Sequence, residues 1–337
     1  NKALKWSNQS IYFSRKYGVM VNKLDECFPI YIEGIMLEYE NKLYEASKKL
    51  REYVGIIESY DKCLATLAEV RAMLNEIRLY LLEGNYTSAH WKLEQVLKTI
   101  SVKRNCLYNP ILSIYDVFCR ASLRVVECDE LISKFIRGNA GDEVFDKALS
   151  ALDECLRNIS CVGSLFGRWE DRLRKVREFF EFVVEAKRRS IKARQVLNHG
   201  KAAKIWFEVS CLLEECVKRR IIWGVEERFI NGDICRTKGF YFIRRALSAD
   251  SWKEKARFYE NAARFFDEAF KLYRGELSSV CGCYRDYCIL WSKYYKRQIS
   301  ERKLAEGLMK ISSAFEALGL VRIGVFVRSE AYGVLGD

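Results

Sequence analysis

Residues 67–100 read LAEVRAMLNEIRLYLLEGNYTSAHWKLEQVLKTI, and this stretch decides the fold class. From Leu67 to Leu81 the apolar residues recur at intervals of three and four, the spacing that places them along one side of a helix. A second stripe with the same spacing runs from Tyr86 to Ile100. Between the stripes lies Gly84-Asn85, and glycine permits the turn that ends one helix before the next begins. The stretch therefore predicts two antiparallel helices joined as a hairpin.

The same helical spacing recurs along the chain, at residues 169–183, 205–216 and 252–273. Only two prolines occur in 337 residues, and short glycine or asparagine breaks divide the sequence into pieces long enough for one or two helices. Residues 320–327 are rich in β-branched side chains, but a single strand would have no partner, so we expect a helix or a docked tail. The predicted fold class is all-α, with antiparallel helical hairpins stacked as a solenoid or an irregular helical bundle.

Charge divides the chain into two regions. Residues 1–167 hold 22 Lys and Arg against 22 Asp and Glu, whereas residues 168–245 hold 20 against 11. The change coincides with the glycines at 163–167, so we expect a neutral helical half at 1–167 and a basic helical half at 168–337. No segment rich in Gly, Ser or Pro separates them, which favours one continuous array. A basic region of this kind attracts nucleic acid or an acidic protein surface.

A family resemblance lies within residues 73–97. Tyr80, the turn Leu81-Leu82-Glu83-Gly84-Asn85-Tyr86 and the small residue Ala89, followed by Leu93 and Leu97, resemble the tetratricopeptide repeat. The chain departs from that pattern at Ile77 and Val96, which replace small residues, and no proline closes the unit. The resemblance covers one unit well and implies a TPR-like protein-binding scaffold without chemistry of its own.

The basic half contains a cluster of cations with aromatic residues between them. If these cations lie on consecutive stacked helices, they form one anion-binding surface, on which Trp206, Phe207 and Trp223 could stack with unpaired bases. The predicted anion-binding residues are Lys187, Arg188, Arg189, Lys192, Arg194, Lys201, Lys204, Lys218, Arg219 and Arg220. The alternative is that the aromatic residues belong to the core and the cations only flank it.

Two histidines leave few ways to build a catalytic site. Arg194 and His199 have the Arg-x4-His spacing of HEPN-type ribonucleases, all-helical proteins that use the pair to hold RNA and transfer a proton, although Gln195 departs from that pattern. The competing interpretation is a helix cap at Asn198-His199-Gly200. The sequence contains no phosphate-binding glycine loop and no hydrolase motif, so we expect no catalytic residues, no cofactor and no enzymatic activity.

Thirteen cysteines without framework spacing predict buried thiols in a reducing, cytoplasmic compartment. Cys281, Cys283 and Cys288 fall within eight residues, but a metal site would need a fourth ligand, so we expect no metal. On a helix, Cys281 and Cys288 share a face and pack as small apolar residues. The sequence contains no uninterrupted apolar run long enough to predict a membrane span.

The leading hypothesis is a non-enzymatic scaffold or adaptor that binds a protein partner. The alternatives are an RNA- or DNA-binding protein, a HEPN-like ribonuclease and a self-assembling structural protein.

Overall fold

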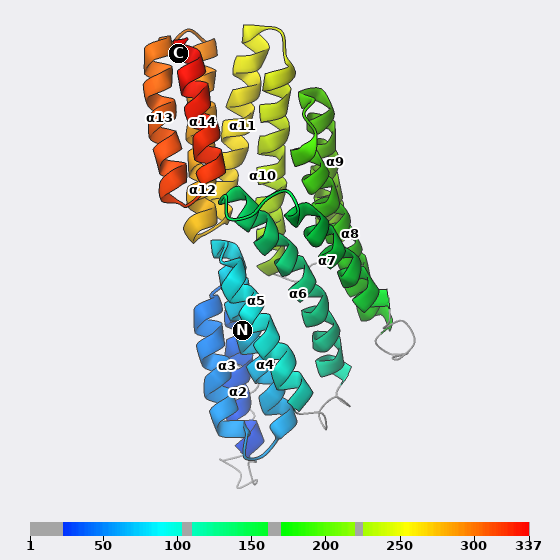
Figure 1. Cartoon of the computed structure of the whole chain (residues 1–337). Coiled ribbons are helices and arrows are strands. Elements are labelled where there is room, and N and C mark those ends of the chain that lie inside the picture. Colours follow the sequence, from blue (N-terminus) through cyan, green and yellow to red (C-terminus); the bar gives the residue numbers. More distant parts are fainter. Residues whose placement is uncertain (1–22, 103–109, 161–169, 220–224, 337) are drawn as a thin grey trace. The chain divides into compact units, whose positions relative to one another are not determined.

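The computed structural model describes residues 23–102, 110–160, 170–219 and 225–336 (Figure 1). Of these residues 88% are helical and none is in a strand, which confirms the predicted all-α class. The helices are α2 (Lys23–Tyr39), α3 (Leu43–Ile57), α4 (Lys62–Glu83), α5 (Tyr86–Val102), α6 (Pro110–Ile136), α7 (Val144–Ser160), α8 (Glu170–Gln195), α9 (His199–Lys218), α10 (Val225–Ser248), α11 (Trp252–Leu272), α12 (Gly275–Tyr295), α13 (Glu301–Ala317) and α14 (Val321–Leu335).

The chain forms two compact units. Unit 1 comprises residues 1–81, 85–126 and 157–174, and unit 2 comprises residues 82–84, 127–156 and 175–337. Unit 1 therefore contains α2 to α5 and most of α6, and unit 2 contains α8 to α14 almost entirely. Residues 127–156 belong to the same unit as the basic half of the chain.

The predicted hairpin in unit 1 is α4 followed by α5. Gly84 adopts a φ of 80°, the left-handed conformation that closes a helix end. Asn85 then caps α5, because its Oδ1 accepts a hydrogen bond from the Ser88 amide at 3.1 Å. Ala89 is fully buried in one cluster with the predicted stripe residues, as expected for the position where two helices approach closely.

Unit 2 is a series of antiparallel helices, each packed against the next along the chain. Side-chain contacts fix the direction: Arg189 meets Glu208 and Arg219 meets Phe182 between α8 and α9, while Trp206 meets Phe240 between α9 and α10. Helices α10, α11 and α12 continue this packing, and α13 packs against α14 (Figure 1). Within unit 2, the α8–α9, α10–α11 and α12–α13 connections therefore lie at the same end.

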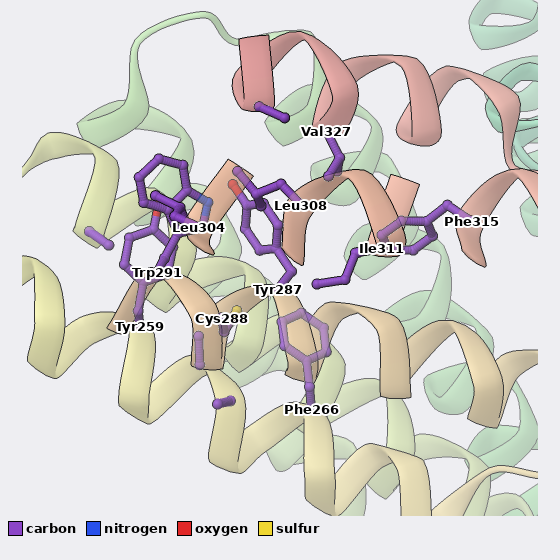
Figure 2. Close-up of a cluster of buried hydrophobic side chains, with 14 of the residues drawn as sticks. Tyr259, Phe266, Tyr287, Cys288, Trp291, Leu304, Leu308, Ile311, Phe315 and Val327 are labelled. Carbon is purple, nitrogen blue, oxygen red and sulfur yellow. The ribbon is translucent and has the colours of Figure 1, made fainter. Parts of the chain in front are cut away.

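The main core of unit 2 joins α11, α12, α13 and α14. Figure 2 shows aromatic rings from α11 and α12 facing aliphatic side chains from α13 and α14. Tyr259 stacks on Trp291 with ring centroids 6.0 Å apart, and Phe315 is fully buried. The C-terminal segment that was predicted as a helix or a docked tail is helix α14, and its Val327 enters this core.

Ten cysteines of the described residues carry free thiols, and seven of them are buried. Cys281 and Cys288 are both buried on α12 in apolar clusters, as predicted. The expectation of buried thiols is wrong at Cys211, which is exposed, and at Cys63, which is in a disulfide bond. Among the helices whose residues are described, none combines the length and the apolar character that a bilayer crossing requires.

Candidate anion-binding surface

Three of the predicted anion-binding residues are occupied by ion pairs that hold α8 in place. The Lys187 Nζ atom lies 2.5 Å from the Asp129 carboxylate of α6, and Arg188 pairs with Asp153 of α7. Arg189 binds Glu185 at 2.7 Å and Glu208 of α9 at 2.8 Å. Burial disfavours the charged Lys187 amine, but the carboxylates beside it outweigh that penalty and raise its pKa. These three cations are committed to helix packing.

Two further predicted cations lie far from the others along α9. Lys218 and Arg219 follow Lys204 by about four turns, which is more than 20 Å at 1.5 Å per residue. Arg219 pairs with Glu215 at 2.8 Å, and its guanidinium lies over the Phe182 ring. Arg220 and Trp223, which belong to the same prediction, lie outside the described residues.

The remaining predicted cations surround the α8–α9 turn. The Asn198 side chain caps α9 by accepting a hydrogen bond from the Lys201 amide at 2.9 Å. This cap places Lys201 and Lys204 on the first exposed turns of α9, opposite Lys192 on the last turn of α8. The Arg194 guanidinium lies over the Trp206 and Phe240 rings, at 5.5 and 5.7 Å from their centroids.

Four cations that the sequence prediction missed lie at the same end of unit 2. Arg244 and Arg245 occupy the last turns of α10, and Lys253 and Arg257 the first turns of α11. Arg244 bonds the His199 Nδ1 atom at 2.7 Å, and Arg245 lies over the Phe258 ring at 5.1 Å. We name the whole group the basic end: Lys192, Arg194, Lys201, Lys204, Arg244, Arg245, Lys253 and Arg257.

The basic end differs from the rest of unit 2 in the pairing of its charges. Six of its cations are exposed, and none of these six forms an ion pair with a carboxylate of the described residues. The six are Lys192, Lys201, Lys204, Arg245, Lys253 and Arg257. Carboxylates near this end are few, with Asp250 and Glu254 beside the α10–α11 turn. Unbalanced exposed cations produce a positive local field that attracts anions.

The aromatic residues of the prediction have separate positions. Trp206 is buried, with 4% of its surface exposed, so it belongs to the core. Phe207, next to it in sequence, points outward and keeps 51% of its surface exposed. Of the three aromatic residues predicted to stack with bases, Phe207 is the one that the structure places at a described surface.

The Arg194 and His199 side chains lie on neighbouring helices, but each has other contacts. His199 accepts its hydrogen bond from Arg244 of α10 when its Nδ1 is unprotonated. Burial and the nearby Arg244 guanidinium both lower the pKa of His199, which favours the neutral form of the ring. Burial also lowers the pKa of Arg244. The guanidinium nevertheless stays charged at pH 7, because the pKa of arginine lies far above neutrality.

The cysteines of α12 do not converge. Cys281 and Cys288 enter different apolar clusters, and Cys283 is half-buried. Burial raises the pKa of the Cys281 thiol to about 12 and that of Cys288 well above its usual value, which disfavours the thiolates that bind metal. Within the described ranges, no three His, Cys, Asp or Glu side chains are grouped as metal ligands.

Comparison with known proteins gives no relative to guide the interpretation. No protein-family model, curated protein or solved structure matches the chain.

Proposed function

We propose that the chain is a non-enzymatic helical scaffold whose basic end docks an anionic macromolecule. The observation that supports the proposal is the set of six exposed cations that come from α8, α9, α10 and α11 and have no carboxylate partner among the described residues. Elsewhere in unit 2 many cations are held by nearby acids, as Lys187 is by Asp129 and Lys238 by Glu214. A surface with unsatisfied charge of one sign is suited to a partner of the opposite sign.

The residues at the basic end favour binding over catalysis. A ribonuclease would need His199 as the proton-transfer group, and its Nδ1 atom is already hydrogen-bonded to Arg244 of α10. The Arg194 guanidinium lies over two rings. Arginines fixed in this way can hold an anion by charge and by bidentate hydrogen bonds.

The proposal is tested with a polyanion whose binding depends on charge alone. Fluorescein-labelled heparin is titrated with the wild-type chain and with the triple variant Lys192→Glu, Lys201→Glu and Lys204→Glu. We expect the triple variant to lose on the order of tenfold or more in affinity, because each reversed charge removes a counterion-releasing contact. Wild-type binding should weaken steeply between about 50 and 200 mM salt.

A matched control separates a defined site from net charge. Lys175, Lys218 and Lys310 are exposed lysines of unit 2 outside the basic end, and Lys175 precedes Lys192 on α8 by more than four turns. Their reversal to Glu changes the net charge by the same amount. We expect this control to bind heparin nearly as tightly as the wild type. Equal losses in the two triple variants, or no binding by the wild type at low salt, would contradict the proposal.

A further inference from the structure

A row of aromatic side chains crosses α9, α10 and α11 beside the basic end. The ring centroids of Phe207 and Tyr241 are 5.5 Å apart, those of Tyr241 and Phe242 are 4.8 Å apart, and Phe242 stacks on Phe265 at 5.5 Å with an interplanar angle of 10°. The row therefore connects three helices through continuous ring contacts. We name it the aromatic row: Phe207, Tyr241, Phe242 and Phe265.

Cations cover one part of this surface and leave the other part open. Lys238 lies over Phe265 at 5.3 Å, and Arg257 and Arg245 lie over the neighbouring Phe258. No described cation lies over Phe207 or Tyr241. Phe207 is half-exposed and Tyr241 is partly exposed, so their rings are the open part of the row.

The antiparallel course of α9 and α10 puts two cations on the same side of the open pair. Lys204 precedes Phe207 by one turn on α9, and Arg245 follows Tyr241 by one turn on α10. Because α9 runs away from the basic end and α10 runs toward it, both cations, which belong to the basic end, lie on the same side of the open rings. The neighbouring carboxylates of Glu208 and Glu214 are already paired, with Arg189 and Lys238.

The arrangement combines exposed cations with exposed aromatic rings, and single-stranded nucleic acid is a ligand that uses both. Proteins bind single-stranded nucleic acid with cations that follow the phosphates and with aromatic side chains on which successive bases stack. An acidic protein surface would use the cations alone and would leave Phe207 exposed to water. A duplex would present its phosphates and keep its base faces stacked on one another.

We propose that the aromatic row is a binding site for single-stranded nucleic acid, in which bases stack on Phe207 and Tyr241 while Lys204, Arg245 and Arg257 contact the phosphates. The inference rests on the proposed function, because it identifies the anion that docks at the basic end. It also assigns a role to Phe207 that the heparin experiment does not require.

The test measures the anisotropy of a fluorescein-labelled oligonucleotide of about 12 thymidines, titrated with the wild type, Phe207→Ala and Phe326→Ala. Phe326 lies on α14 and is 55% exposed, against 51% for Phe207, so its variant is a control of equal side-chain loss. We expect Phe207→Ala to lower the affinity about tenfold, the usual effect of removing one stacking ring, and Phe326→Ala to leave it unchanged. Far-ultraviolet circular dichroism should be the same for all three proteins.

Two further measurements separate this inference from the proposed function. Labelled heparin should bind Phe207→Ala as tightly as the wild type, because heparin has no bases to stack. Arg257→Gln should reduce the slope of log affinity against log salt by about 0.7 for the oligonucleotide, the value for one phosphate contact on a single strand.

The outcomes are distinct. Equal oligonucleotide affinity for the wild type and Phe207→Ala, or tighter binding of a duplex of the same length, would overturn the single-strand site even if heparin binds at the basic end. If the wild type does not bind heparin even at low salt, that result would instead contradict the proposed function.

Discussion

The paired charges of unit 1 contrast with the exposed cations at the basic end of unit 2. In unit 1 the buried carboxylate of Glu38 lies between two guanidiniums, 2.5 Å from Arg71 and 3.2 Å from Arg78, and Glu76 likewise binds Arg51 and Lys92. In unit 2 the six exposed cations of the basic end have no carboxylate partner among the described residues, and the largely buried carboxyl of Glu330 has no described cation beside it. The ion pairs of unit 1 hold helices together, as those of Lys187 and Arg189 do in unit 2. The cations of the basic end, in contrast, stay available for a ligand.

The largest effect is expected at the paired carboxylate of unit 1. Glu38→Ala leaves two partly buried guanidiniums, those of Arg71 and Arg78, without their carboxylate, and removing one partner of such a pair costs about 3–5 kcal/mol. Urea unfolding followed by circular dichroism measures the loss. Glu45→Ala, which removes an exposed carboxylate from the same unit, is the control and should change little. A loss below about 1 kcal/mol for Glu38→Ala would mean that the guanidiniums find water instead.

The next effect concerns the unpaired carboxyl in the core of unit 2. Glu330 accepts a hydrogen bond from the Tyr287 hydroxyl at 3.1 Å, while its buried Oε2 atom has no hydrogen-bond partner in the described part of the chain. Burial raises the pKa of Glu330 to about 7, although the Tyr287 hydrogen bond acts in the opposite direction. Tyr259, Tyr295 and Cys288 also interact with it, and none of these groups supplies a positive charge.

The pH dependence follows from that raised pKa. The folded chain keeps the Glu330 proton up to about pH 7, whereas the unfolded chain releases it near pH 4.5, so the stability contributed at low pH is lost as the pH rises through this window. Between pH 5 and pH 8 the loss amounts to about 2–3 kcal/mol. Glu330→Gln, which stays neutral, should remove this part of the pH dependence. Parallel urea curves for the two proteins at both pH values measure the difference, and identical pH dependence would show that Glu330 reaches solvent.

The smallest effect on stability is expected at the basic end itself. Lys201→Ala and Lys204→Ala should each change the free energy of unfolding by less than about 0.5 kcal/mol, because neither amine has an ion-pair partner among the described residues. The same urea measurement at pH 7 provides the comparison with Glu38→Ala. A loss above about 1 kcal/mol would indicate that these lysines hold the fold, as Lys187 does, and would remove the contrast between the units.

The helical fold could be predicted because its signal is local. The stripes on either side of Gly84 became α4 and α5, and the β-branched segment after Leu320 became α14. Helix-forming residues at intervals of three and four define a buried face whatever its partner is. The tetratricopeptide resemblance of residues 73–97 stays a prediction, since no family comparison tests it.

The candidate surface could be predicted only in part, because charge pairing depends on contacts that are distant in sequence. Lys187 looked as available as Lys192, but its carboxylate partner lies 58 residues earlier in the chain. Arg244 reaches His199 across 45 residues, so nothing in the local sequence marks it as part of the basic end. The antiparallel order of the predicted helices would have placed the ends of α8 and α10 together, and this was the signal that could have found Arg244 and Arg245.

The aromatic rings beneath the arginines also affect the cost of binding. A free arginine side chain gives up about 2 kcal/mol of rotamer entropy when a ligand fixes it. Arg194, Arg245 and Arg257 already lie over aromatic rings, which restricts their motion before any ligand arrives. Part of the entropic penalty is therefore met during folding, and a partner reaching these guanidiniums meets a surface whose donors are set in advance.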